Sequence, residues 1–195
     1  MLKLLKASLL LLVVASCGIM TPGTAPRNLD NACSIVQQRP QYLRAFKATQ
    51  RKWGIPVNVQ MAIIHQESKF KKAAKTPRRY VLGVIPRGRQ SSAYGYAQAL
   101  DGTWSEYKQS TGRFAARRSS IRDSADFIGW YMTETKRRTG VALSDARNQY
   151  LAYHEGQSGF IRGTHRKKSW LLEIADNVAD RASRYRRQLQ SCGKI

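Results

Sequence analysis

Acidic residues are scarce in this sequence. Its 195 residues include 34 Lys and Arg but only 12 Asp and Glu, which leaves a formal net charge of +22. Such a charge repels cationic partners and concentrates polyanions near the surface. The charge therefore indicates the sign of a partner and not its identity, and we expect most of these cations simply to solvate helix faces.

The sequence also lacks a continuous apolar run of about 20 residues, the length that a membrane-spanning helix needs. Its longest apolar run, from Leu9 to Val14, follows Lys3 and Lys6 and ends at small residues. This order is typical of a secretory signal peptide. We therefore predict that residues 1–16 are a signal peptide and that the chain is exported. An exported chain rarely meets nucleic acid, so we expect no nucleic-acid partner.

Cysteine is rare too, with three residues in the chain. The first, Cys17, ends the segment Val-Ala-Ser-Cys, which resembles the lipobox of bacterial lipoproteins. In that motif the cysteine becomes the first mature residue and carries lipid, and several acyl chains give durable membrane anchoring. The alternative is an ordinary cleavage site followed by a chance cysteine. With Gly18 next, the resemblance implies a lipoprotein on the periplasmic side of the outer membrane.

The other two cysteines, Cys33 and Cys192, lie near the two ends of the remaining chain. In an exported protein a single remaining pair is expected to form a disulfide, with two free thiols as the alternative. Residues 17–32 are rich in Gly, Pro and Thr and are predicted to form a flexible tether. We expect residues 33–192 to form one domain, followed by a short tail over residues 193–195.

Hydrophobic spacing in this domain is mostly helical. The predicted fold is mainly α, of the α+β kind, with a small irregular β-prone insert around residues 78–94, where Gly and Pro interrupt short β-branched runs. Ser120 and Ser144 are predicted to cap two helices, and Thr103 with Glu106 fits a capping box at the start of another. Helices are expected from Pro40 to Gly54, from Pro56 through Glu67, around Trp104 and Tyr107, from Ser120 to Gly140, from Ser144 to Gly156, and over residues 171–189.

One glutamate stands out among the five in the chain. Glu67 lies one helical turn after Ile63 and Ile64, on or near the face that they bury. A carboxyl group in a low-dielectric cleft has its charged form disfavoured, so its pKa rises and it can act as a general acid near neutral pH. The alternative is a structural glutamate that pairs with one of the many Arg residues.

Three segments, in order along the chain, resemble the blocks of the soluble lytic transglycosylase family, relatives of goose-type lysozyme. They are IHQESKF, which is similar to the Glu-Ser block, AYGYAQALDGTW, which is similar to the Gly-Leu-Met-Gln block, and YLAYHEG, which is similar to the Ala-Tyr-Asn block. The resemblance implies a lysozyme-like fold with the glycan in a cleft between a helical lobe and a β-prone lobe. The matching residues are Glu67, Ser68, Gly95, Gln98, Ala152, Tyr153 and Gly156.

The resemblance also implies a reaction. Glu67 would protonate the bond between N-acetylmuramic acid and N-acetylglucosamine in peptidoglycan and then accept the proton of the muramic 6-hydroxyl, which leaves a 1,6-anhydro end. It implies a monomer with no metal and no cofactor. A hydrolase of the same bond, with Asp101 or Glu155 as second acid, stays open, and so does a non-catalytic basic lipoprotein that binds the envelope.

Substrate contacts follow from the same resemblance, with two departures from the family pattern. Tyr96 and Ala97 replace Leu and Met, and His154 stands where Asn is usual, which leaves its role open. Tyr96 or Trp104 would stack on a sugar face or pack in the core. The basic stretch from Lys69 to Gln90 looks longer than usual. The residues expected to contact substrate are Ser68, Gly95, Tyr96, Gln98, Tyr153 and His154.

Overall fold

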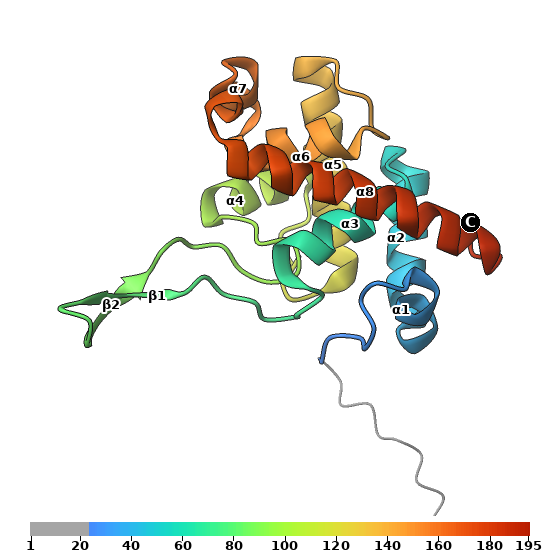
Figure 1. Ribbon diagram of the computed structural model, residues 1–195, viewed down its shortest axis with the longest axis horizontal. Coiled ribbons are helices and arrows are strands. Elements are labelled where there is room, and N and C mark those ends of the chain that lie inside the picture. Colours follow the sequence, from blue (N-terminus) through green and yellow to red (C-terminus); the bar gives the residue numbers. More distant parts are fainter. Residues whose placement is uncertain (1–23) are drawn as a thin grey trace, which may run out of the picture.

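The computed structural model describes residues 24–195 and is mainly helical, as predicted (Figure 1). A 3-10 helix, η1, spans Thr164–Lys167, and two strands form the only sheet of the described residues, β1 (Arg78–Val81) and β2 (Ile85–Arg89). In that part of the chain the α-helices are α1 (Ala32–Gln38), α2 (Pro40–Trp53), α3 (Val57–Ser68), α4 (Asp101–Thr111), α5 (Ile121–Thr139), α6 (Ala146–Glu155), α7 (Gln157–Ile161) and α8 (Ser169–Ser191).

Helix α3 lies in the centre of the molecule. Every residue from Val57 to His65 is buried, so this helix is enclosed by the fold on nearly all sides, with polar Asn58, Gln60 and His65 among its buried side chains. It packs against α2, α5, α6 and the long helix α8, which crosses the body in Figure 1. Helix α8 has the single apolar stripe expected from its sequence, and that stripe rests on α3 and α6. The core of the fold is therefore built around the helix that carries Glu67.

The helix ends confirm some of the sequence predictions and correct others. Ser120 caps α5, since its side chain accepts a hydrogen bond from the Asp123 amide. Helix α6 begins one residue later than predicted, because Asp145 and not Ser144 accepts from the Asn148 amide. Helix α4 begins at Asp101 with no side-chain cap, so the predicted capping box is wrong. An aspartate in the first turn favours this earlier start.

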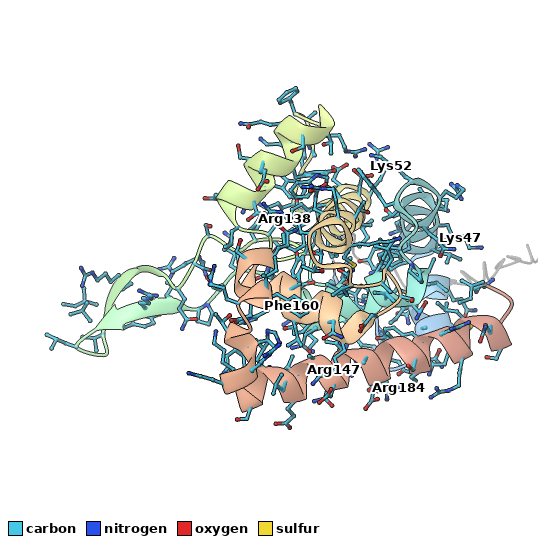
Figure 2. The ribbon with its side chains drawn as sticks, turned by 90° about the horizontal axis from the view of Figure 1, so that it is seen from above. Lys47, Lys52, Arg138, Arg147, Phe160 and Arg184 are labelled. Atoms are coloured by element: carbon cyan, nitrogen blue, oxygen red, sulfur yellow. A yellow bond between two sulfur atoms is a disulfide. The ribbon has the colours of Figure 1, made fainter. Side chains whose placement is uncertain are left out.

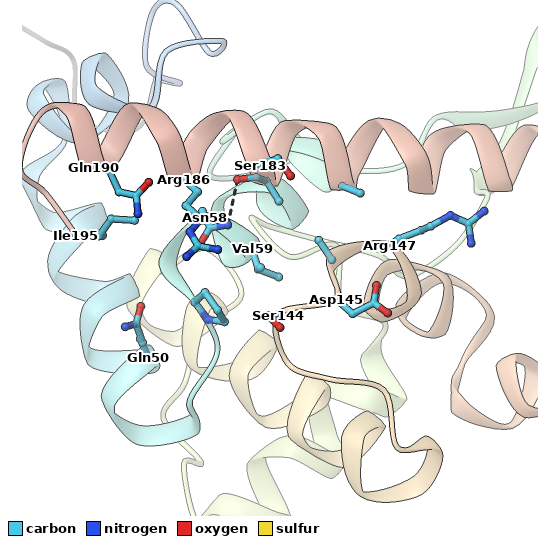
Figure 3. Close-up of a pocket in the computed structure, with 14 residues that line it drawn as sticks. Gln50, Asn58, Val59, Ser144, Asp145, Arg147, Ser183, Arg186, Gln190 and Ile195 are labelled. Atoms are coloured by element: carbon cyan, nitrogen blue, oxygen red, sulfur yellow. Dashed lines mark hydrogen bonds between the residues drawn. The ribbon is translucent and has the colours of Figure 1, made fainter.

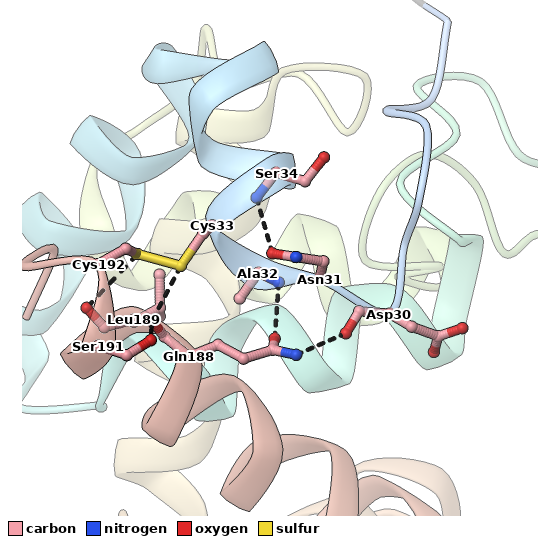
Figure 4. Close-up of a disulfide and its surroundings, with 9 residues drawn as sticks. All are labelled: Asp30, Asn31, Ala32, Cys33, Ser34, Gln188, Leu189, Ser191 and Cys192. Carbon is pink, nitrogen blue, oxygen red and sulfur yellow. Dashed lines mark hydrogen bonds between the residues drawn. A yellow bond between two sulfur atoms is a disulfide. The ribbon is translucent and has the colours of Figure 1, made fainter.

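A disulfide joins Cys33 of α1 to Cys192 at the end of α8, as predicted (Figure 4). Their Cα atoms are 6.4 Å apart although the residues are separated by 159 positions. Gln188 strengthens the same junction, since its side chain accepts from the Ala32 amide at 2.8 Å and donates to the Asp30 carbonyl at 3.0 Å. The two ends of the described chain are thus fastened to each other.

The predicted β-prone insert is a two-stranded antiparallel hairpin that projects from the helical body (Figure 1). Both strands are exposed along their whole length. None of the helices within residues 24–195 is long and apolar enough to cross a membrane.

Candidate active site

The last turn of α3 positions Glu67 in the fold. After Ser68 the chain turns sharply, because Lys69 and Phe70 both have left-handed backbones, with φ of 51° and 58°. Two consecutive non-glycine residues in this region store conformational strain, which persists only where the surroundings hold it. Phe70 restrains the backbone here, because its ring is fully buried and stacks on the ring of Tyr42, with 5.8 Å between the ring centroids. The end of α3 is therefore fixed by the core.

Glu67 has an unusual electrostatic environment for this protein. Seven of the twelve carboxylates form ion pairs with Lys or Arg. Within residues 24–195, the carboxyl group of Glu67 has neither an ion pair nor a hydrogen bond. Its side chain keeps some solvent exposure, but protein atoms surround it, and this burial raises its pKa to about 8 while the charge of Lys69 acts in the opposite direction. The group therefore holds a proton at neutral pH.

Lys69, whose charge acts on Glu67, also contacts a histidine of α3. Its Nζ lies 3.4 Å from Nδ1 of His65, one turn earlier on α3. Burial, and then the charge of Lys69, lowers the pKa of His65 to about 3, so this imidazole is neutral and can accept a hydrogen bond.

Two tyrosines of α6 share the electrostatic environment of Glu67. Burial, and then the negative charge of Glu67, raises the pKa of Tyr150 and of Tyr153 above the usual value. Both phenols therefore stay neutral. The Tyr153 hydroxyl donates to the Ala97 carbonyl, which links α6 to the loop of the second sequence block. Tyr150 was not predicted, although its position three residues before Tyr153 places it on the same face of the helix.

The second block forms a tight loop around Gly95 and Gln98. Gly95 has φ of 80°, and a Cβ atom there would lie 2.0 Å from the Arg118 carbonyl oxygen, so only glycine fits. Gln98 has φ of 49°, and its Nε2 donates to the carbonyl oxygens of Ala74 and Gly95 at 3.0 and 2.8 Å. The side-chain amide of Gln98 thus holds the loop together.

A cavity of about 260 Å³ brings the second and third blocks side by side. Gln98 lies on one side of it, and Tyr153 and His154 lie on the other. The remaining walls come from α4, α5 and the end of α6. Three of the residues predicted to contact substrate therefore meet at one hollow. Glu67 does not line this hollow itself.

Other predicted site residues serve the structure. Ser68 is buried and its hydroxyl donates to the Ile64 carbonyl one turn earlier, at 3.2 Å. Tyr96 is buried, and its hydroxyl lies 3.0 Å from that of Tyr42. Trp104 is buried among aromatic side chains of α4 and α5. Of the two roles considered for Tyr96 and Trp104, packing in the core is the one that the structure supports.

The two candidates for a second acid are both engaged with cations. Glu155 accepts from Lys168 Nζ at 2.8 and 2.9 Å, and Thr164 also donates to it. These hydrogen bonds lower its pKa to about 2. His154 contacts the same carboxylate through Nδ1 at 3.1 Å. Asp101 pairs with the Arg118 guanidinium at 2.7 Å.

Another cavity lies elsewhere, between the first turns of α3 and α6 and the second half of α8 (Figure 3). It measures about 620 Å³, and Asn58 at its wall donates to the Ala182 carbonyl at 3.0 Å. None of the residues that match the family blocks lines it. The described residues also contain no cluster of three or more His, Cys, Asp or Glu side chains placed to hold a metal.

A mainly helical chain with a projecting hairpin and a carboxyl group whose pKa is raised by burial fits the lysozyme-like class that the three sequence blocks indicate. The family comparison identifies the group within that class. Residues 5–192 match the family described as transglycosylase SLT domain, so the chain belongs to this family. Membership implies transglycosylase-type activity on peptidoglycan. A search among curated proteins found no match.

Proposed function

We propose that this protein is a lytic transglycosylase that cleaves the β-1,4 bond between N-acetylmuramic acid and N-acetylglucosamine. The observation that supports this most directly is the carboxyl group of Glu67, which has no ion pair within residues 24–195 and a pKa raised to about 8. A general acid must hold its proton at the working pH and release it in the transition state. A carboxyl group with an ordinary pKa would already be ionised.

In the proposed reaction one carboxyl group acts twice. Glu67 gives its proton to the glycosidic oxygen as the bond to C1 of the muramic residue breaks, and the acetamido group of that sugar stabilises the positive charge at C1. The resulting Glu67 carboxylate accepts the proton of the 6-hydroxyl, whose oxygen bonds to C1. The products are a 1,6-anhydro end and a free 4-hydroxyl, and Glu67 is protonated again. No water is consumed.

The environment of the other acids favours this lyase over a hydrolase. Glycosidases that use water usually need a second carboxylate as nucleophile or base. Asp101 and Glu155 are held by Arg118 and Lys168. The 6-hydroxyl is already tethered to the reacting ring, and intramolecular attack has a large advantage in effective concentration. A muramidase is the alternative, with one of these two carboxylates released from its partner.

The test is digestion of purified sacculi in heavy-oxygen water. We expect 1,6-anhydromuropeptides whose new muramic ends carry no solvent oxygen and resist borohydride reduction. Labelled, reducible ends would instead assign a hydrolase. Glu67→Gln should remove sacculus clearing, while Glu173→Gln, an exposed glutamate on α8, should retain it. Clearing by Glu67→Gln above a few per cent of wild type would contradict the single-acid mechanism. If the wild type binds sacculi without cutting them, the protein is a non-catalytic binder.

We also propose that the enzyme works from the periplasmic side of the outer membrane, as a monomer anchored by lipid on Cys17. The signal peptide, Cys17 and residues 18–23 of the tether lie outside the described residues, so this proposal depends on the sequence motif alone. Cys17→Ala should move the protein from the membrane fraction to the soluble fraction or leave it unprocessed. Membrane recovery equal to that of the wild type would remove the lipobox assignment.

A further inference from the structure

The hairpin of β1 and β2 has a surface that its own folding does not explain. We call residues 80–85 the hairpin tip. Its five large side chains are between 39% and 86% exposed, and Leu82 is the most exposed of them. An isolated two-stranded hairpin has no core to fill. Soluble proteins rarely expose so many adjacent apolar side chains outside an interaction site. The members with large side chains are Tyr80, Val81, Leu82, Val84 and Ile85.

The turn of the hairpin places an apolar residue where folding favours a polar one. Residues 82–84 connect the strands, and Leu82 and Gly83, with φ of 53° and 74°, are the central residues of a turn that the Val84 amide closes by donating to the Val81 carbonyl. Turns with two positive φ values prefer Asn-Gly or Asp-Gly, because a leucine in the left-handed region is strained. Leu82 therefore occupies the outermost position in spite of a conformational cost. This placement favours a role for the side chain outside the hairpin.

Basic residues stand directly behind the tip. No Asp or Glu occurs between Glu67 and Asp101. We define the basic collar as the cations of the two strands together with the three lysines that precede them in sequence. Its members are Lys71, Lys72, Lys75, Arg78, Arg79, Arg87 and Arg89. Cations also cover the rest of the body, as the labelled residues of Figure 2 illustrate, but there they are not joined to an apolar tip. The hairpin thus combines an apolar end with a positive base.

We propose that the hairpin tip inserts into the interface of a phospholipid bilayer with anionic headgroups. Aliphatic side chains gain free energy when they leave water for the acyl boundary, and each Lys or Arg near an anionic surface adds to the attraction. A polyanionic glycan complements the basic collar but offers no apolar phase for Leu82 and Val84. Charge and hydrophobicity together therefore favour a membrane surface.

The backbone of the hairpin sets how deep it can go. Along the edge that they share, the two strands pair their backbone amides and carbonyls with each other, and Val81 lies opposite Ile85. The outer edges carry unpaired amides and carbonyls, which the hydrocarbon core does not tolerate. The hairpin therefore lies at headgroup depth, with the side chains of its tip pointing into the acyl boundary. This mode is that of an interfacial protein and not of a membrane span.

The hairpin is connected to the candidate active site at both ends. It leaves the turn after Glu67 and returns to the loop of Gly95, and a bridge between Lys75 and Tyr94 closes its base. A tip held in a bilayer would therefore orient the Glu67 end of α3 relative to that membrane. The inference does not depend on the proposed catalysis, because binding is measured without substrate.

The test compares variants of the full chain, all with Cys17→Ser so that no acyl chain contributes. An environment-sensitive dye on Val84→Cys should shift to the blue with vesicles of phosphatidylcholine and phosphatidylglycerol, and much less with phosphatidylcholine alone. The same dye on Phe114→Cys, a position 70% exposed between α4 and α5, should not shift. No shift at Val84, or equal shifts at both positions, would overturn the proposal.

Vesicle co-sedimentation separates the two components of the surface. Leu82→Ser with Ile85→Ser should weaken binding to the anionic vesicles by about tenfold or more, because two aliphatic side chains no longer leave water. Phe114→Ser is the control at equal net charge and should bind as the parent chain does. If the variant with both tip substitutions binds the vesicles as well as the parent chain does, the proposal is overturned.

Charge is tested in the same way. Arg78→Gln with Arg87→Gln should weaken anionic binding more than Arg51→Gln with Arg187→Gln, which removes the same charge from exposed positions on α2 and α8. Equal losses would reduce the effect to net charge and contradict a localised basic collar. Self-association that depends on the tip, with no vesicle binding, would assign the tip to a second copy of the chain and refute the membrane proposal.

Discussion

Replacing Glu67 by glutamine should stabilise the folded protein, and the gain should grow with pH. The pKa of this carboxyl group rises from 4.5 in the unfolded chain to about 8 in the fold, mainly because of burial. Between these values the unfolded state has released the proton while the folded state retains it. Stability then falls as pH rises, since fewer protons are bound by the unfolded state than by the native one. The glutamine side chain of the variant has no proton to lose and escapes this penalty.

The size of the effect follows from the same shift. One pKa unit corresponds to about 1.4 kcal/mol. The penalty on wild type is absent below pH 4.5, increases up to pH 8, and then stays constant at an upper limit of about 5 kcal/mol. A difference of this order is a large part of the total stability of an ordinary domain.

The assay is urea unfolding of wild type, Glu67→Gln and Glu173→Gln, with the disulfide intact, at a series of pH values from 4 to about 9. We expect the Glu67→Gln gain in free energy of unfolding to be small at the acid end and several kcal/mol at the alkaline end, while Glu173→Gln shows no such trend. The kcat/KM of wild type on sacculi should fall as pH rises through about 8, as the acid loses its proton. A gain for Glu67→Gln that does not depend on pH would refute the raised pKa.

Three further substitutions test the architecture around this site. Cys33→Ser opens a covalent loop with a sequence separation of 159 and should lower the free energy of unfolding by up to about 5 kcal/mol in the chain-entropy treatment, measured by urea unfolding. Gly95→Ala places a Cβ 2.0 Å from a backbone carbonyl oxygen and should destabilise by several kcal/mol, and a melting temperature equal to that of wild type would contradict this. His65→Phe removes the partner of Lys69, so the ammonium should act more strongly on Glu67 and move the alkaline limb of the activity profile to lower pH.

The hydrophobic pattern predicted the fold well where burial alone decides the structure. The apolar stripe of α8 and the apolar run from Met61 to Ile64 in α3 are both visible in the sequence, and both are buried as these patterns require. The same pattern singled out Glu67, because a carboxylate beside Ile63 and Ile64 contradicts it. Residues that conflict with their local pattern are where function is expected. The disulfide was predictable because only one cysteine pair remained after Cys17.

Sequence reasoning left the role of a residue open where the outcome depends on contacts between distant segments. Whether Tyr96 packs or stacks on sugar depends on Tyr42, which is 54 residues away. The role of Glu155 depends on Lys168, which lies beyond η1 in a stretch where no helix was predicted. Helix starts were missed for a local reason, since Asp145 and Ser144 are both good capping residues. Only backbone geometry decides which of two adjacent candidates accepts the amide hydrogen.

The buried carboxyl group of Glu67 is not ion-paired, although the chain has 34 Lys and Arg, and the surroundings of Lys69 bear on this. Lys69, two residues from Glu67, is turned by a left-handed backbone and bound at 3.4 Å to His65. That arrangement works only while His65 is neutral, and burial lowers its pKa to about 3. The same buried surroundings therefore raise the pKa of the acid and hold the imidazole in the form that retains the nearest cation. Both effects have one cause, the burial of these side chains at the end of α3.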